Sequence, residues 1–239
     1  MARFANPSES YRANASLKRH HLARPPARQS VQNSSSVATP EVISAEEFLG
    51  HLPRLRELER QGDVAALIAE LSNPLETPGG TDAASVRGAA AGHLGHIAGE
   101  EAVEPLVELL GDRLGLARLQ AAQALGWIGS RSATPALLDA LRESDKILQD
   151  AIITSLGMIG DPRAVPQIRR FLAETTANFV YGRGAALAAL LMVDDLEARK
   201  VAEEELRKER WWRRRGVRRT VAYRRLASAR RAQRLDGQS

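Results

Sequence analysis

The dipeptide Leu-Gly recurs at a fixed spacing of 31 residues, at positions 94–95, 125–126 and 156–157. Around it a longer pattern repeats, in which an Ala-rich segment is followed by a proline at 105, 135 or 166. A diverged fourth copy surrounds Leu190, and a partial copy begins at Gln61. Such a period predicts stacked repeats, because one unit of this size cannot bury its apolar face alone.

Each unit predicts two helices. In the first, Ala90, Leu94 and Ile97 follow one another at intervals of four and three, which places them on one buried stripe. The second helix carries a similar stripe, with the proline in its first turn, where a missing N–H costs little. The glycine of Leu-Gly is expected to let the chain turn. The pattern predicts an all-α fold, an α-solenoid of about four to five helix pairs with disordered or helical basic termini.

A family resemblance rests on three consecutive stretches of the sequence. They read VRGAAAGHLGHIAGEEAVEPLVELLGD, ARLQAAQALGWIGSRSATPALLDALRE and LQDAIITSLGMIGDPRAVPQIRRFL. These stretches resemble HEAT-like repeats of the short, regular type found in phycobilisome lyases and in many bacterial proteins. The resemblance covers about residues 45–206 and implies an α-solenoid. The repeat class includes chromophore lyases and many plain scaffolds.

The formal net charge of +5 conceals a segregation along the chain. Residues 1–40 carry +5, residues 41–206 carry −11, residues 207–234 carry +12, and Asp236 adds −1. We therefore expect a disordered basic N-terminal tail over 1–40, a repeat solenoid over 41–206 and an Arg-rich extension over 207–239. The first helix is expected to start near Ser44, with Glu47 as its capping-box partner.

Several classes of protein are disfavoured by composition. The chain has no cysteine, so it holds neither a disulfide scaffold nor a thiolate metal site. The longest apolar run, Ala185 to Val193, has nine residues and is too short to span a bilayer. No secretory signal is recognised, and a cytoplasmic location is expected. Residues 1–40 are Arg- and Ser-bearing and nearly free of acids, so an organelle transit peptide stays open beside the favoured solvated tail.

Little in the repeats points to catalysis. His93 and His96 lie three apart on one expected helix, a spacing compatible with two metal ligands. His96 shares its repeat slot with Trp127 and Met158, which favours ordinary variation over a metal site. The iron-binding deoxyhypusine hydroxylases, which this repeat type also resembles, use His-Glu pairs, and the chain contains no His-Glu dipeptide. We expect no metal, no cofactor and no catalytic residue, and we favour a protein that is not an enzyme.

Two sets of polar residues are candidates for partner contacts. Arg87, Arg118 and Arg183 share one repeat slot and could form a ladder, but pairing of each with a nearby acid is favoured. The second helices should line a concave, partner-binding face with polar side chains. That set comprises Glu104, Glu108, Asp139, Arg142, Gln167 and Arg170.

The Arg-rich extension gives the sharpest functional signal. Its arginines spread around the whole circumference of an expected helix and alternate with aromatic residues, which suits phosphate contact and base stacking. Binding to an acidic protein surface, the chain's own included, is an equal alternative, and an anionic membrane is a weaker one. The tryptophans could instead cover the open end of the last repeat. The candidate polyanion-binding residues are Trp211, Trp212, Arg213, Arg214, Arg215, Arg218, Arg219, Tyr223, Arg224, Arg225, Arg230 and Arg231.

The sequence thus favours a non-enzymatic scaffold or adaptor that binds a partner protein on its concave face. Its Arg-rich tail would contact nucleic acid or an acidic partner, and self-association stays open. The alternative, implied by the repeat resemblance, is a subunit of a phycobilin lyase or isomerase. A helical-repeat DNA glycosylase is disfavoured, because aromatic residues make up only 4% of the chain.

Overall fold

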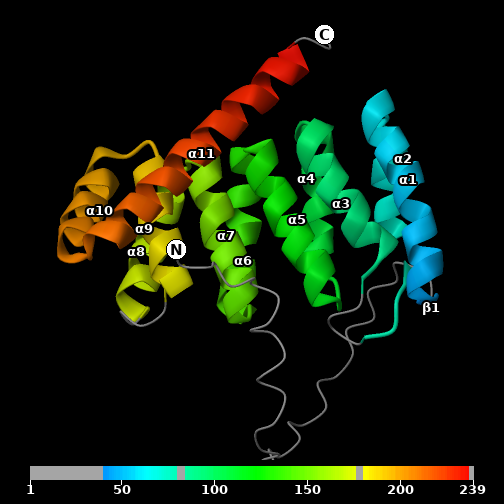
Figure 1. Ribbon diagram of the computed structural model, residues 1–239, viewed down its shortest axis with the longest axis horizontal. Coiled ribbons are helices and arrows are strands. Elements are labelled where there is room, and N and C mark those ends of the chain that lie inside the picture. Colours follow the sequence, from blue (N-terminus) through cyan, green and yellow to red (C-terminus); the bar gives the residue numbers. More distant parts are fainter. Residues whose placement is uncertain (1–39, 80–83, 176–179, 237–239) are drawn as a thin grey trace, which may run out of the picture. The chain divides into compact units, whose positions relative to one another are not determined.

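The computed structural model describes residues 40–79, 84–175 and 180–236 of the chain. The chain divides into two units, Met1–Ser36 and Val37–Ser239, and residues 1–39 of the predicted N-terminal tail lie outside the described residues. In the described part the second unit is an α-solenoid of five helix pairs, followed by one long helix (Figure 1). The predicted fold class is confirmed. No described helix has the length and apolar character needed to cross a membrane.

Five pairs of helices follow one another along the solenoid. The first helices of the pairs are α1 (Ala45–Gln61), α3 (Val86–Ile97), α5 (Gly115–Ile128), α7 (Lys146–Ile159) and α9 (Val180–Met192). The second helices are α2 (Val64–Ala69), α4 (Val103–Leu109), α6 (Thr134–Glu143), α8 (Val165–Glu174) and α10 (Leu196–Lys208). Helix α11 (Trp211–Asp236) ends the described chain. Short 3-10 helices cover Glu70–Ser72, Glu100–Ala102, Arg131–Ala133 and Pro162–Ala164, and the two-residue strands β1 (Glu41–Val42) and β2 (Leu75–Glu76) pair in parallel.

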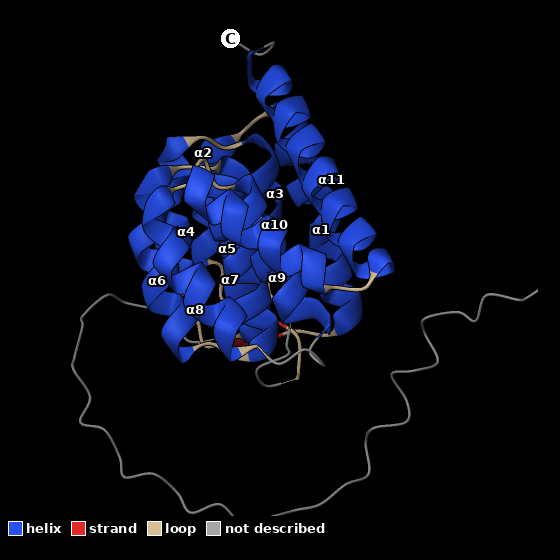
Figure 2. Cartoon of the chain, turned by 90° about the vertical axis from the view of Figure 1, so that its left-hand side faces the viewer, coloured by secondary structure: helices blue, strands red, loops and turns tan. Residues whose placement is uncertain are grey.

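The helices form two layers (Figure 2). From α3 to α9, successive first helices pack closely against one another, whereas α4, α6 and α8 pack mainly against first helices. The core lies between the layers and is aliphatic, with fully buried leucines such as Leu94, Leu125 and Leu156. Helix α11 belongs to the same compact unit and lies across the first-helix layer, in contact with α9, α7 and α3.

Local sequence signals explain where the helices begin. Ser44 caps α1 as expected, and its hydroxyl accepts a hydrogen bond of 3.1 Å from the backbone N–H of Glu47. Prolines occupy the first turns of α6 and α8, as predicted. Asp63 and Asp195 cap α2 and α10 by accepting backbone N–H groups. These side chains and prolines satisfy or remove backbone donors that a helix start leaves unpaired.

The glycine of each Leu-Gly pair lies inside a helix, so the expectation that it turns the chain is wrong. Left-handed turns are made three residues after Gly126 and Gly157 by Gly129 and Gly160, at φ 76° and 71°. The repeated glycine instead lets adjacent first helices approach. A Cβ added at Gly157 would lie 2.5 Å from Cα of Ala189 in α9, which is too close for any side chain.

We therefore predict that Gly157→Ala destabilises the protein by about 1–3 kcal/mol, because α7 and α9 must move apart. Urea unfolding followed by circular dichroism measures the change. The matched control is Gly50→Ala in α1, where an added Cβ meets nothing within 4 Å. That control should stabilise by about 0.5–1 kcal/mol through helix propensity. Equal effects of the two substitutions would contradict the close-contact role of Gly157.

Candidate functional site

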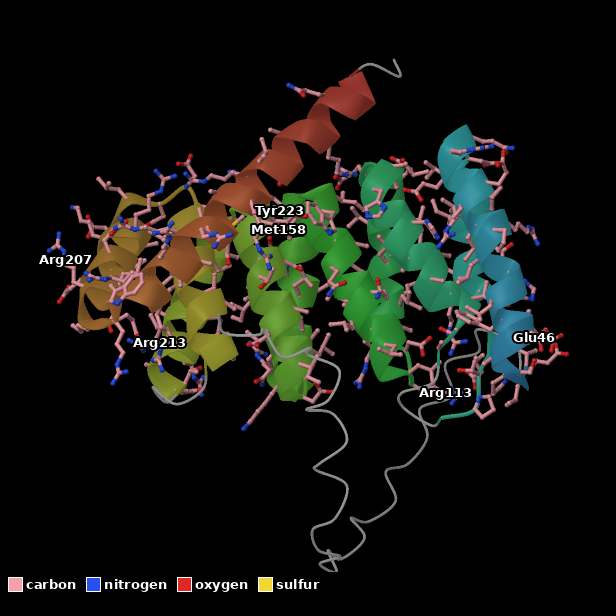
Figure 3. The ribbon with its side chains drawn as sticks, in the orientation of Figure 1. Glu46, Arg113, Met158, Arg207, Arg213 and Tyr223 are labelled. Atoms are coloured by element: carbon pink, nitrogen blue, oxygen red, sulfur yellow. The ribbon has the colours of Figure 1, made fainter. Side chains whose placement is uncertain are left out.

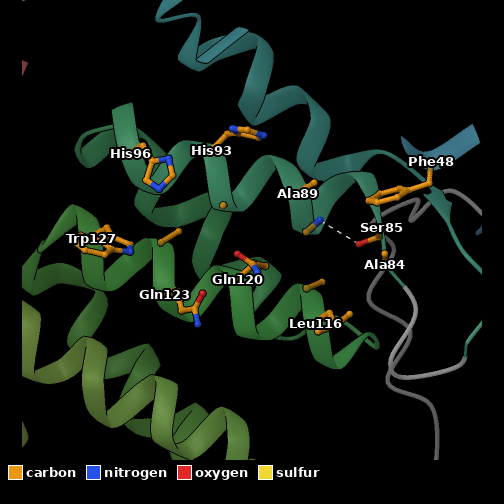
Figure 4. A pocket seen from close by; sticks show the side chains of 14 residues that line it. Phe48, Ala84, Ser85, Ala89, His93, His96, Leu116, Gln120, Gln123 and Trp127 are labelled. Carbon is orange, nitrogen blue, oxygen red and sulfur yellow. Dashed lines mark hydrogen bonds between the residues drawn. The ribbon is translucent and has the colours of Figure 1, made fainter. Parts of the chain in front are cut away.

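The first-helix face carries two hollows. The smaller one, here the α3–α5 hollow, has a volume of about 400 Å³ and is lined by α3 and α5, with Phe48 of α1 at one end (Figure 4). In Figure 4 His93, His96 and Trp127 lie toward the other end. Its lining residues are Phe48, Ala84, Ser85, Gly88, Ala89, Gly92, His93, His96, Leu116, Ala117, Gln120, Gln123, Ala124 and Trp127.

The two histidines of the α3–α5 hollow share one carboxylate. Nδ1 of His93 lies 2.6 Å from Oε2 of Glu59, and Nδ1 of His96 lies 2.9 Å from Oε1 of the same residue. Burial raises the pKa of Glu59, but the hydrogen bonds from both histidines outweigh burial, and the net shift is downward. The pair therefore ties α1 to α3. Among the described residues, no set of three His, Cys, Asp or Glu side chains is arranged to hold a metal ion.

The larger hollow, here the α11 groove, has a volume of about 1020 Å³ and lies between α11 and the helices α5, α7 and α9. In Figure 3 the labels of Met158 and Tyr223 mark where α11 crosses the first-helix layer. Two large apolar side chains of its lining, Ile147 and Tyr223, are each 68% exposed. Its lining residues are Leu119, Gln123, Trp127, Ile147, Asp150, Ala151, Thr154, Ser155, Met158, Arg183, Gly184, Ala185, Leu187, Ala188, Ala189, Met192, Glu209, Arg213, Gly216, Val217, Arg219, Thr220, Tyr223 and Arg224.

Helix α11 is held on the solenoid by a narrow apolar contact and by arginines. Val217 and Val221, one helical turn apart, are its buried apolar side chains among those described. Arg225 donates a 2.8 Å hydrogen bond to the carbonyl oxygen of Leu191, near the end of α9. Arg231 donates to the carbonyl oxygens of Gly95 and Ala98 at the end of α3. Arginine is favourable there because the last carbonyls of a helix are unpaired and carry partial negative charge.

The structure divides the remaining tail candidates into three groups. Arg213 and Arg218 form ion pairs with Glu209 and Glu203 at 3.1 and 3.0 Å. Arg224 contacts the sulfur of Met158. The side chains of three others make no ion pair or hydrogen bond with a described residue, namely those of Arg214, Arg215 and Arg219.

The structure tests the possible covering role of the two tail tryptophans at Trp211 only. Trp211 is 67% exposed, so the interpretation that it covers the open end of the last repeat is wrong for this residue. The side chains of Trp212 and Arg230 lie outside the described part. Polyanion binding by the tail stays a prediction, while its contacts with the chain's own solenoid are observed.

Two of the three arginines at the shared repeat position form the ion pairs that the sequence favoured. Arg87 forms ion pairs with Asp112 and with Glu76, the latter at 3.2 Å. Arg183 pairs with Glu205 and Glu209 at 2.8 and 2.6 Å. The third member, Arg118, makes no such contact with a described residue. Pairing with acids of the same chain, rather than a ladder toward a partner, is therefore confirmed for Arg87 and Arg183.

The second-helix candidates lie on the layer opposite the two hollows. Successive first helices pack closely in one layer, and both hollows lie on the first-helix side of the solenoid. A role of the second helices in partner binding stays a prediction. All six side chains, at least partly exposed, are on α4, α6 and α8: Glu104, Glu108, Asp139, Arg142, Gln167 and Arg170.

Two residues of the α11 groove were missed from sequence. Ile147 lies outside the buried stripe of its helix, and a large apolar residue on the polar side of an amphipathic helix is the signal that was available. Asp150 has one carboxylate oxygen that is buried without a hydrogen-bond donor, and burial raises its pKa. No local pattern marks Asp150, because its burial depends on neighbouring helices.

Comparison with known proteins places these observations in context. The family model for HEAT repeats matches residues 80–153 and 134–222. Among solved structures, the complex of CpcE and CpcF of phycocyanin lyase from Nostoc sp. PCC7120 is similar at a TM-score of 0.52 and 23% identity, covering 80% of each chain. The search of curated proteins gave no significant match.

The Glu59 contacts generate a prediction on pH. We expect Glu59→Gln to lower the free energy of unfolding at pH 7 by about 1 kcal/mol, through weaker hydrogen bonds between α1 and α3. A carboxylate whose pKa is lower in the folded state stabilises above its unfolded pKa, about 4.3, and loses that effect as the pH falls through the lowered value. The difference in the free energy of unfolding between Glu59→Gln and the wild type should therefore shrink at low pH. Chemical unfolding from pH 7 to pH 3 measures it, with the exposed Glu104→Gln as control.

Proposed function

Because the chain belongs to the HEAT-repeat family, we propose that it is a non-enzymatic scaffold that binds a partner protein on its first-helix face. The observation that carries this proposal is the pair of hollows on that face. Exposed apolar side chains gather there, with Leu116 40% exposed and Ile147 and Tyr223 each 68% exposed. Grouped apolar side chains on one surface are typical of protein interaction sites.

The tail supplies a second, electrostatic contact. Arg215 and Arg219 are exposed on α11, and with Arg214 they make no contact with a described carboxylate. Their guanidinium groups suit the phosphates of nucleic acid or the carboxylates of an acidic partner. Such contacts would add affinity and orientation to the apolar site rather than replace it.

A subunit of a bilin lyase is the second candidate. The likeness in fold to the phycocyanin lyase complex, which extends over 80% of both chains, favours it. An attachment assay with a phycobiliprotein and free bilin distinguishes the candidates. Bilin transfer or tight bilin binding would favour the lyase subunit over the scaffold.

The scaffold proposal predicts that Ile147, an exposed side chain on the first-helix face, contributes to partner binding. We expect Ile147→Asp to reduce recovery of the partner about tenfold when the tagged full chain is purified from its native cells, because it places a charge in an apolar interface. Leu196→Asp on α10 is the matched control, since Leu196 is also 68% exposed and lies in the first turn of a second helix. Quantitative mass spectrometry measures recovery.

The same experiment tests the second-helix face. If Glu104→Lys and Glu108→Lys abolish recovery while Ile147→Asp does not, the partner binds the opposite layer, and the first-helix proposal fails. Equal recovery of the partner with every variant would likewise contradict a partner site on the first-helix face.

The tail proposal predicts a salt-dependent contact with polyanions. Arg215→Ala with Arg219→Ala should weaken binding of a labelled single-stranded RNA or DNA and lower the slope of log affinity against log salt by about 1.4. Arg56→Ala with Arg169→Ala removes the same charge from exposed sites on α1 and α8. Fluorescence anisotropy across a salt series measures both. Substitution is preferable to truncation, because α11 buries Val217 and Val221. Unchanged binding in the tail variant would sink the polyanion contact.

A further inference from the structure

One partly buried arginine of the α11 groove forms no ion pair with a described residue. Arg224 reaches down from α11, is about half buried, and has as its described polar contact only the sulfur of Met158 at 3.5 Å. Burial lowers the pKa of Arg224, since desolvation disfavours its charged form. In the same groove Arg183 is paired with two glutamates. Burying an unpaired guanidinium group in such a place costs free energy unless an anion pairs with it.

The floor of the groove holds a carboxylate, that of Asp150 in α7. One of its oxygens is buried within the protein and accepts no hydrogen bond, so only the other oxygen is open to a donor in the groove. Its neighbours in the lining include the apolar side chains Ile147 and Met158. The groove therefore offers a cation in its roof, an acceptor in its floor and apolar surface between them. A volume of about 1020 Å³ is at the upper end of ordinary binding sites.

We propose that the α11 groove binds an acidic, apolar peptide segment of the partner protein. A carboxylate of the segment pairs with Arg224, an N–H group donates to Asp150, and apolar side chains pack on Ile147, Met158 and Tyr223. A peptide satisfies both polar groups at once, because it carries N–H donors as well as acidic side chains. A fatty acid or detergent supplies an anion but no donor. This inference rests on the proposed scaffold function and names the chemistry of its partner.

The test uses a labelled model peptide of about four helical turns, with leucine on one face and glutamate elsewhere. Fluorescence anisotropy measures its binding to the full chain. We expect Arg224→Met to weaken binding by about tenfold, the effect of losing one charge-assisted contact. Arg224→Lys should retain most of the affinity. The matched control is Arg218→Met, which removes the same charge from an exposed site on the same helix and should change affinity less than about twofold.

Thermal unfolding separates this role from a structural one. Arg224→Met should leave the melting temperature unchanged or raise it, since it replaces an unpaired, partly buried charge with an apolar side chain. A lower melting temperature together with lost binding would assign Arg224 to the fold and overturn the inference.

Other outcomes would also overturn it. They are no binding of the acidic peptide to wild type, equal binding when its glutamates are replaced by lysines or its leucines by serines, and equal losses in Arg224→Met and Arg218→Met. Displacement of the peptide by dodecanoate at equal concentration would reassign the groove to amphiphilic anions. If Ile147→Asp abolishes partner recovery but Arg224→Met does not, the scaffold function stands and only this inference fails.

Discussion

The close approach of successive first helices is the contact on which the rest of the structure depends. Gly95, Gly126 and Gly157 each face the next helix, where an added Cβ would lie 2.5–2.9 Å from a neighbouring atom. Backbones that approach this closely gain dispersion contacts over their whole length. The repeat period sets the position of each contact along the chain. Because the first helices pack so tightly, they form the layer on which both hollows and helix α11 lie.

Part of the positive charge of helix α11 is neutralised by contacts with the chain's own solenoid. Some of its arginines pair with solenoid glutamates such as Glu203, and others donate to carbonyl oxygens at the ends of α3 and α9. The positive segment thus meets both ionised side chains and helix termini. The arginines that make no such contact are informative. The side chains of Arg214, Arg215 and Arg219 make no ion pair or hydrogen bond with a described residue, and Arg224 faces the α11 groove with the sulfur of Met158 as its described polar contact. The internal contacts therefore separate arginines that hold the fold from those available to a partner.

Much of the fold could be predicted because its signals are local. Ser44 at the start of α1 and the prolines of the second helices act within one turn. The role of the repeated glycine was mistaken, although its position was recognised. A glycine near a helix end is compatible with a turn and with a close contact, and only the neighbouring helix distinguishes them. The pairing of Arg87 was favoured correctly from the acidic character of the middle segment.

The sequence by itself determined the period, the helix pairs and the division of charge between middle and ends. Its residues encode these through propensity, capping and spacing, which need no distant partner. The tertiary structure alone decided which layer is hollowed and where the basic helix lies. Arg231 meets Gly95, a residue 136 positions away, and Asp150 becomes buried through helices that flank it. Such contacts depend on how the repeats stack, and no pattern within one repeat records that geometry.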